Sequence, residues 1–242
     1  MEKLIYLVWM EPETPPEEAR ETMLGDVATS LLGAGVHALT VDVDDEFAQV
    51  PPPAPPPADE NPVRAVVSVW VDTYDTRAPL EAILSGDGER RIAGYQAVES
   101  LYRDYGGNQW SGVRDWPDGA RSPGVLTVSL IEQKRGMEFE DWITFWHTKQ
   151  SPMSEAIQPR ARYVRNALFR SVTPDAPPYR AIVEEAWPTV EHLTDPMLFY
   201  CADGSEATMK ANVTTMIEHV SQFIDFDTFR NLTLSEYIVK SL

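Results

Sequence analysis

The order of predicted strands and helices is the same in the two halves of this 242-residue chain. Each half contains a strand-like apolar run, a helical pattern, two further strand-like runs, a second helical pattern and a last strand-like run. This β-α-β-β-α-β order is that of the ferredoxin-like motif. The expected strands lie at residues 3–10, 36–43, 63–73, 92–105, 124–133, 166–172, 179–187 and 229–239, and the expected helices at 14–35, 77–85, 138–150 and 206–224.

A four-stranded sheet with both helices on one face leaves its other face uncovered. Two such sheets in one chain can bury these faces against each other. The predicted fold class is therefore α+β, with two tandem ferredoxin-like β-α-β-β-α-β units that form a pseudo-symmetric α+β barrel. We expect an N-terminal unit at residues 1–104, a glycine-rich linker at 105–124 and a C-terminal unit at 125–242.

Residues 50–62, VPPPAPPPADENP, interrupt the N-terminal unit between its second and third strands. Their seven prolines favour an extended polyproline conformation. We interpret the segment as a stiff surface loop, and the alternative is a ligand for a proline-recognising domain.

Composition excludes several classes of partner. The net charge of -18 repels phosphate backbones and anionic lipids, so we expect neither nucleic acid nor a membrane as partner.

The single cysteine, Cys201, cannot form an internal disulfide, which suits a cytoplasmic protein. The opening MEKLIYLVWMEPE is typical of a strand rather than a signal peptide, and no segment has the roughly 20 apolar residues of a membrane helix. We expect a monomer with two similar halves, or a homodimer.

The stretch FEDWITFWHTKQSPM, residues 139–153, resembles the helix of EthD-domain proteins in the dimeric α+β barrel superfamily. Trp142, Trp146, Pro152 and Met153 match that family's pattern. Gln150 stands where the family usually has a histidine, and His147 directly follows the tryptophan instead. The N-terminal half shares only the order of elements and the opening EKLIYLVW.

The resemblance implies the barrel fold more strongly than a reaction, because fold alone does not determine function. Relatives in the superfamily include cofactor-free oxygenases and cyclases that act on aromatic polyketides, lactone isomerases and haem enzymes. The family thus suggests a small apolar or aromatic ligand, and we expect no bound cofactor. Metal ligation is not predicted either, because His37, His192 and His219 show no spacing typical of zinc or haem sites.

Candidate site residues come from the helix at 138–150 and the strand at 179–187. His147 borders the apolar face of its helix, so it is either a neutral base with a lowered pKa or only a polar residue at the edge of the core. The amide of Gln150 can orient a ligand but cannot transfer protons at neutral pH. Glu184 and Glu185 face opposite sides of their strand, and the nearby arginines 160, 162, 165 and 170 either pair with them or bind a substrate carboxylate.

These considerations give two sets of predicted roles. The catalytic candidates are His147, Glu185 and Tyr179, and the substrate-binding candidates are Trp142, Trp146, Gln150, Tyr6 and Arg180. The first functional hypothesis is an EthD-like enzyme that performs dehydration, cyclisation, isomerisation or oxidation without a cofactor. The second is a non-catalytic protein that binds the same kind of ligand, and the third is a partner module recruited through the proline-rich loop.

Overall fold

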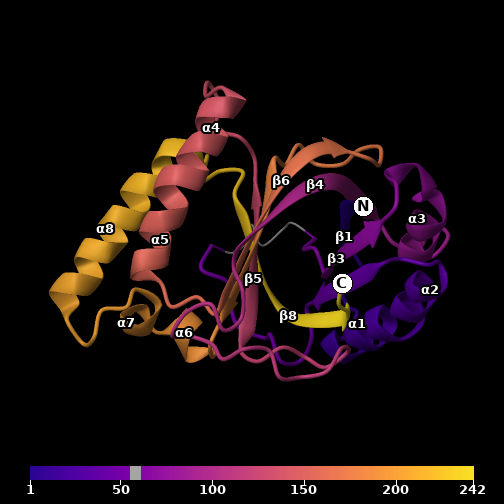
Figure 1. Ribbon diagram of the computed structural model, residues 1–242, viewed down its shortest axis with the longest axis horizontal. Helices are drawn as coiled ribbons and strands as arrows, with labels where there is room; N and C mark the ends of the chain where they lie inside the picture. The colour runs from indigo at the N-terminus through magenta and orange to yellow at the C-terminus, as the bar shows by residue number, and fades with distance from the viewer. Residues whose placement is uncertain (55–60) are drawn as a thin grey trace.

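The computed structural model describes residues 1–54 and 61–242, and its strands close into one antiparallel barrel (Figure 1). Part of the predicted proline-rich loop, at 55–60, lies outside the described residues. The strands are β1 (Glu2–Val8), β2 (Ala38–Val43), β3 (Ala65–Val71), β4 (Ile92–Arg103), β5 (Val125–Ile131), β6 (Arg162–Ser171), β7 (Ala181–Trp187) and β8 (Arg230–Lys240).

Helices cover the barrel on two opposite sides, with α1 to α3 on one side and α4, α5 and α8 on the other (Figure 1). The α-helices are α1 (Pro16–Thr22), α2 (Ala28–Gly33), α3 (Ala78–Ser85), α4 (Phe139–Phe145), α5 (Ser151–Ile157), α6 (Glu191–Thr194), α7 (Pro196–Phe199) and α8 (Glu206–Phe223). Two π turns, η1 (Met23–Val27) and η3 (Trp146–Gln150), join α1 to α2 and α4 to α5, and η2 (Tyr74–Thr76) is a 3-10 turn. None of these helices is long and apolar enough to cross a membrane.

The strand order shows the same topology in each half. Around the barrel the order is β1-β3-β2-β8-β5-β7-β6-β4, which contains β4-β1-β3-β2 from the first half and β8-β5-β7-β6 from the second. The two sheets meet where β2 pairs with β8 and where β4 pairs with β6. The predicted fold class, two ferredoxin-like units in a pseudo-symmetric α+β barrel, is confirmed. The boundaries at 104 and 125 stay a prediction.

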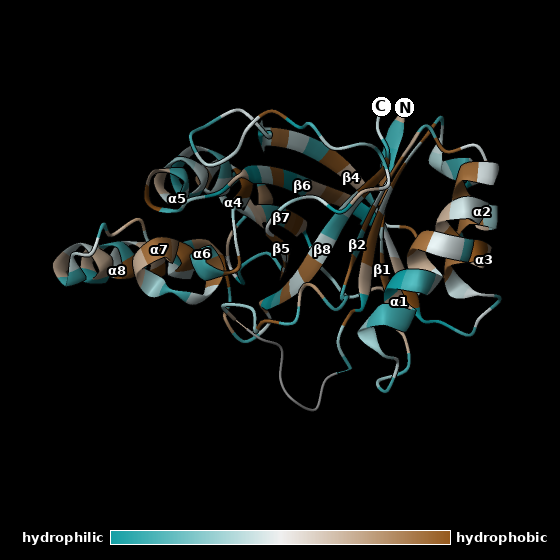
Figure 2. Ribbon diagram, turned by 90° about the horizontal axis from the view of Figure 1, so that it is seen from below, coloured by the Kyte–Doolittle hydropathy of each residue, from teal (hydrophilic) through white to brown (hydrophobic). Residues whose placement is uncertain are grey.

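Alternate residues of β1 face two different cores, because strand side chains point to opposite faces in turn. Leu4, Tyr6 and Val8 belong to the core beneath α1 to α3. Ile5 and Leu7 belong to the barrel interior. Figure 2 shows hydrophobic colouring along β1, hydrophobic and hydrophilic residues in turn along β8, and mostly hydrophilic residues on α1. Each half therefore has a layer between sheet and helices, and both halves share the interior.

The helix predicted at 138–150 in fact continues through η3 and α5 to Ile157, seven residues beyond its expected end. Pro152 does not end the helix, because it stands in the first turn of α5, where a missing amide hydrogen is tolerated. Strand β6 also begins at Arg162 rather than at 166. Its start was missed because Arg162 occupies an inward position that is normally apolar.

Charged side chains occupy part of the barrel interior. Lys3 Nζ donates to Asn166 Oδ1 at 2.9 Å and lies 3.6 Å from Glu184 Oε1. Arg162 Nη1 donates to Glu236 Oε1 at 2.7 Å. Every one of these five residues except Arg162 is classed as buried, and Arg162 is largely covered. Buried charges of this kind are tolerated when they are paired and hydrogen-bonded.

Asp42 lies among these charges without a hydrogen-bond partner. Its side chain is 1% exposed, and neither carboxylate oxygen accepts a hydrogen bond from the described residues. Burial raises the pKa of Asp42 well above its usual range, and the nearby carboxylates of Glu184 and Glu236 raise this pKa further. The protonated form of Asp42 is therefore favoured in the folded protein.

We expect Asp42→Asn to reduce the loss of stability at high pH. In the unfolded chain Asp42 ionises near pH 4, whereas in the folded chain it stays protonated to higher pH. The contribution of Asp42 to the free energy of unfolding is therefore fully present below pH 4 and is lost as pH rises toward the folded pKa. Each unit of difference between the two pKa values is worth about 1.4 kcal/mol. Urea unfolding at pH 5, 7 and 9 measures the effect, with the exposed Asp26→Asn as control. An identical pH dependence in Asp42→Asn and the unsubstituted protein would contradict it.

Candidate functional site

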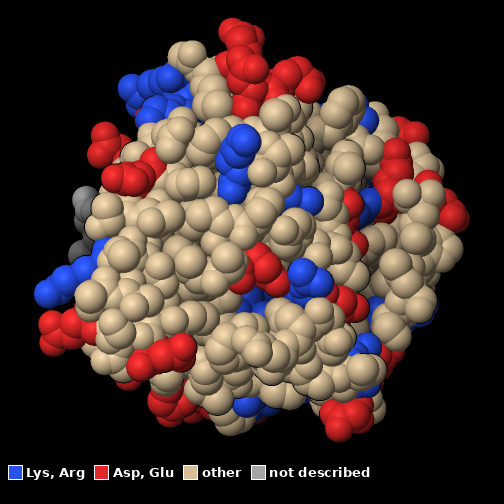
Figure 3. Space-filling view, turned by 60° about the vertical axis from the view of Figure 1, so that its left-hand side comes forward, with Lys and Arg blue, Asp and Glu red and all other residues tan. Residues whose placement is uncertain are grey.

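A pocket of about 300 Å³ lies between the outer face of the second sheet and helices α5 and α8. Its volume is at the lower end of the range of about 300 to 1,000 Å³ that is usual for small-molecule sites. Strand β5 contributes Thr127 and Ser129, the π turn η3 contributes Trp146 and Gln150, and α8 contributes apolar residues such as Val220. Figure 3 turns this side of the molecule forward and shows scattered charges separated by broad uncharged areas.

The period of the strands brings polar side chains to the pocket. Thr127 and Ser129 are two residues apart on β5, so both face the helices. Thr127 Oγ1 accepts a hydrogen bond from Trp187 Nε1 at 2.9 Å, and Asn231 Nδ2 of β8 donates to Ser129 Oγ at 2.8 Å. The strand side of the pocket is thus polar, whereas α8 supplies an apolar side.

An ion pair of Arg160 and Glu185 lines the same pocket. Arg160 is 1% exposed, and its Nη1 donates to Glu185 Oε1 at 2.6 Å. Its Nη2 donates to Ser154 Oγ at 2.9 Å, and its guanidinium lies 4.0 Å from the centre of the Tyr163 ring. Burial lowers the pKa of Arg160, but the carboxylate of Glu185 more than offsets this and raises the pKa above its ordinary value. Arg160 is therefore a fixed cation that holds Glu185 in place.

Three residues that line the pocket carry a buried polar atom without a hydrogen-bond partner among the described residues. These atoms are Gln150 Oε1, Arg160 Nε and Asn231 Oδ1. A buried polar group left without a partner costs about 1 to 3 kcal/mol of stability. Several such groups beside an apolar surface are typical of a binding site whose ligand supplies the missing hydrogen-bond partners.

The N-terminal half provides a comparison for this pocket, because its elements have the same spacing. Strand β5 begins 123 residues after β1 (Val125 and Glu2), and η3 begins 123 residues after η1 (Trp146 and Met23). This register relates the pocket residues Thr127, Ser129, Gln150 and Ser154 to Leu4, Tyr6, Val27 and Leu31. Strands β3 and β7 have equal length, so that Glu185 corresponds to Val69.

All five of these N-terminal residues are buried members of the core beneath α1 to α3. The same backbone positions are thus occupied by an apolar core and a tyrosine ring in one half, and by a polar-lined pocket in the other. Since both halves fold, the polar side chains of the second half are not required by the fold itself.

The predicted residues of the 138–150 helix have different positions relative to the pocket. Trp146 and Gln150 line it. Trp142 lies behind Trp146, with ring centres 5.4 Å apart, and its Nε1 donates to Phe223 O at 2.8 Å. His147 contacts the Trp146 ring but is not among the residues that line the pocket.

The remaining predicted residues are dispersed. Glu185 lines the pocket, whereas Tyr6 lies in the core of the N-terminal half. Tyr179 packs beside Tyr95, with ring centres 6.4 Å apart, and the Arg180 guanidinium lies 4.8 Å from the centre of the Phe139 ring. The structure therefore brings Trp146, Gln150 and Glu185 together, and leaves Tyr6, Tyr179 and Arg180 elsewhere.

Sequence reasoning did not identify Ser129 or Asn231 as site residues. It named Arg160 only among four arginines that either pair with Glu184 and Glu185 or bind a substrate carboxylate, and the structure pairs Arg160 with Glu185. The constant offset of 123 residues between the halves could have indicated Ser129, because it gives the C-terminal half a serine at the position equivalent to the buried Tyr6. Arg160 follows the part of the helix that was missed. The side chains that line the pocket include no histidine or cysteine, and the described residues contain no cluster of three or more potential metal-binding side chains.

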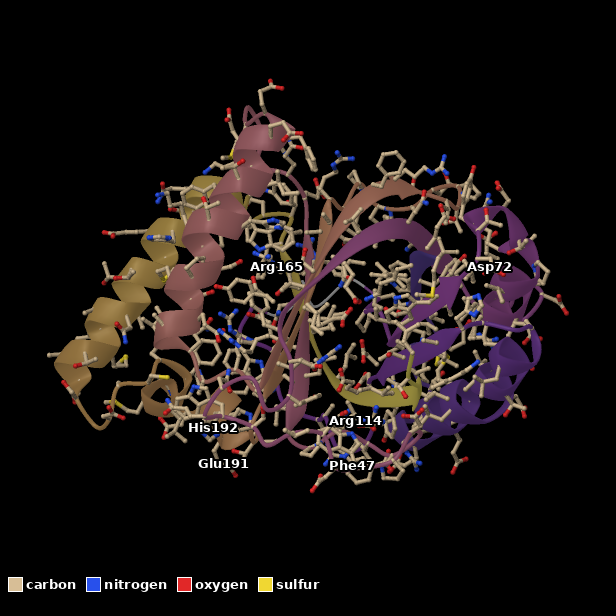
Figure 4. The ribbon with its side chains drawn as sticks, viewed as in Figure 1. Phe47, Asp72, Arg114, Arg165, Glu191 and His192 are labelled. Carbon is tan, nitrogen blue, oxygen red and sulfur yellow. The ribbon has the colours of Figure 1, made fainter. Side chains whose placement is uncertain are left out.

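His147 is held in a neutral form at the edge of this helix. Its Nε2 is buried and has no hydrogen-bond partner among the described residues. Burial lowers the pKa of His147 to about 4, and the positive charge of Arg165 contributes. Figure 4 shows Arg165 between the sheet and the helix that carries His147. Both interpretations of His147 from the sequence remain, since a lowered pKa is compatible with each.

We expect the His147 imidazole to titrate near pH 4 in a proton–carbon NMR spectrum of the folded protein. Because the folded pKa is depressed, His147 contributes stability above the unfolded pKa of about 6.5, and this is lost as pH falls toward 4. Arg165→Met should raise the midpoint only partly, since burial is the larger cause. Arg170→Met on the same strand is the matched control. A midpoint near 6.5 would contradict the burial described above.

Comparison with known proteins supports the fold. No protein-family model and no curated protein sequence match the chain. Among solved structures, an anthrone oxidase-like protein is 8% identical, with 99% of this chain and 94% of that chain covered and a TM-score of 0.56. A dye-decolorizing peroxidase from Bacteroides thetaiotaomicron is 6% identical, with 98% and 93% covered and a TM-score of 0.50. At these identities the likeness shows the fold alone, which is the closed α+β barrel of this chain.

Proposed function

We propose that this protein is an enzyme that binds a small, largely apolar or aromatic molecule in the pocket of its C-terminal half. The observation that carries the proposal is the contrast between the halves, in which Gln150 and Glu185 replace the buried Val27 and Val69. A structural role alone does not explain polar side chains where the same fold accepts apolar ones. The neighbours' names, an oxidase-like protein and a peroxidase, are in keeping with an enzyme.

Glu185 is the group we assign to proton transfer. Its side chain is 17% exposed and lines the pocket, and only its Oε1 accepts a hydrogen bond from the described residues. Oε2 can accept a proton from an acidic C–H or O–H of the bound molecule, and Arg160 stabilises the anion that remains. Return of the proton to another atom completes an isomerisation, and its transfer to a leaving hydroxyl completes a dehydration. The Trp146 ring forms one wall of the site, and the Gln150 amide orients the ligand.

A non-catalytic binding protein is the second candidate. The ion pair with Arg160 favours this alternative, because Arg160 Nη1 lies 2.6 Å from Glu185 Oε1 and a carboxylate that pairs with a buried guanidinium has a structural role without any reaction. Gln150 cannot transfer protons, and His147 is not among the residues that line the pocket. The matches at Trp142, Trp146, Pro152 and Met153 support the further proposal that this chain is an EthD-like protein.

Replacing pocket residues by their N-terminal counterparts tests the binding site. We expect Gln150→Val combined with Ser154→Leu to fill part of the pocket, because the leucine is larger than the serine, and to remove the polar side chain of Gln150. Together these changes should lower the affinity for 2-naphthol roughly tenfold or more in calorimetry. The unsubstituted protein should bind one molecule per chain, because only its C-terminal half has this pocket among the described residues. Gln222→Val on the exposed side of α8 is the control. Unchanged binding by the filled variant, with its fold retained, would exclude this pocket as the site.

Exchange of protons with deuterium distinguishes the enzyme from the binding protein without knowledge of the natural substrate. We expect the unsubstituted protein to accelerate exchange of the benzylic C–H of 2-tetralone with D2O, followed by NMR. Glu185→Gln should bind 2-tetralone and lower the catalysed rate by roughly 100-fold or more, as loss of a general base does. The exposed Glu191→Gln is the control. Binding without any accelerated exchange would favour the non-catalytic alternative.

A further inference from the structure

Tyr6 fills the space of the N-terminal half that corresponds to the pocket. It pairs across the sheet with Gly94 of β4, and its side chain is fully buried. A Cβ atom on Gly94 would lie 2.5 Å from Tyr6 Cε1, so the phenol ring packs directly against the glycine backbone. The hydroxyl of Tyr6 lies 3.4 Å from Glu81 Oε1 of α3. The N-terminal half thus encloses a phenol of its own between sheet and helix.

The equivalent pair in the C-terminal half is Ser129 and Asn231. Ser129 stands 123 residues after Tyr6 and pairs with Asn231 of β8, as Tyr6 pairs with Gly94 of β4. Both residues line the pocket. The C-terminal half thus has a serine where the N-terminal half has a tyrosine ring, and this difference in size leaves space at the pocket.

We propose that the pocket binds an uncharged phenolic ring, placed over Ser129 and Asn231 as the Tyr6 ring is placed over Gly94. The inference rests on the proposed function and identifies the class of ligand for the same site. A phenol supplies one hydrogen-bond donor, which either of the unpartnered acceptors Gln150 Oε1 and Asn231 Oδ1 can accept. A ring between Trp146 and the apolar side of α8 buries its carbon atoms as Tyr6 does.

The charges of the pocket exclude a carboxylate ligand of the same shape. The one cation among its lining residues, Arg160, is already paired with Glu185 at 2.6 Å. A second carboxylate would meet Glu185 at short range in a pocket with an apolar side, where like charges repel and burial of a charge is costly. Within this site an uncharged ligand is thus favoured over an anion. A hydroxyl is favoured over a group that only accepts hydrogen bonds, because it can donate to Gln150 Oε1 or Asn231 Oδ1 and also accept from Arg160 Nε.

Three naphthalene probes that differ in one substituent test the class of ligand. We expect 2-naphthol to bind the unsubstituted protein roughly tenfold tighter than 2-methoxynaphthalene, which cannot donate a hydrogen bond. We expect 2-naphthoate to bind more weakly still. Equal affinity of the naphthol and its methyl ether would overturn this inference while leaving the pocket as the binding site. Absence of binding by all three probes would instead contradict the proposed function.

A variant with its own phenol tests where the ring lies. Ser129→Tyr with Asn231→Gly transfers the Tyr6–Gly94 pair to the C-terminal half, and we expect it to fold and to lose 2-naphthol binding at least 100-fold. Ser129→Ala with Asn231→Ala changes the same positions, leaves the space open and should retain weaker binding. A folded tyrosine variant with unchanged affinity would overturn the placement. If that variant does not fold, the alanine variant and the three probes still decide. The alanine variant lacks Asn231 Oδ1 and keeps Gln150 Oε1, so its preference for naphthol over the methyl ether should be smaller than that of the unsubstituted protein, and an unchanged preference would overturn the placement.

Discussion

The rest of the structure depends on the closure of two four-stranded sheets into one barrel. Each sheet has helices on a single face, so its other face would be exposed to water if the sheets were separate. The pairings of β2 with β8 and of β4 with β6 satisfy the backbone hydrogen bonds at the sheet edges and bury both inner faces together. Closure also fixes the outer faces, where each half has a separate layer between sheet and helices.

That separation lets the two halves differ in what their outer layers contain. In the N-terminal half the layer is a continuous apolar core that includes Leu4, Tyr6 and Val69. In the C-terminal half a pocket with the Arg160–Glu185 pair occupies the corresponding layer. The cost of unpartnered polar atoms is confined to that half, and the shared interior carries its own paired charges around Lys3 and Arg162.

The sequence was sufficient to predict the fold because the apolar runs and helical patterns occur in the same order twice. It was insufficient where a residue type departed from its usual place. The helix expected to end at residue 150 continues to Ile157, because Pro152 stands in the first turn of α5, where proline is tolerated. The start of β6 at Arg162 was not predicted, because an arginine stands at an inward position that is usually apolar. Its charge is tolerated there because Arg162 Nη1 donates to Glu236 Oε1. For the site, the aromatic helix pointed to Trp146 and Gln150, but the pattern could not show that Tyr6 lies in the other layer.

The π turns η1 and η3 extend this comparison of the two halves to the long helical segment of each half. Turns of this kind interrupt α-helices most often at functional sites. Here η1 has the same length and relative position as η3 although the N-terminal half has an apolar core beneath it. The wide turn is therefore a property of how the long helix packs on this sheet, and the side chains at its positions decide whether a site forms. The two halves of one molecule thus separate what the fold requires from what a ligand requires. The same backbone arrangement encloses a filled apolar core in the N-terminal half and an open pocket in the C-terminal half.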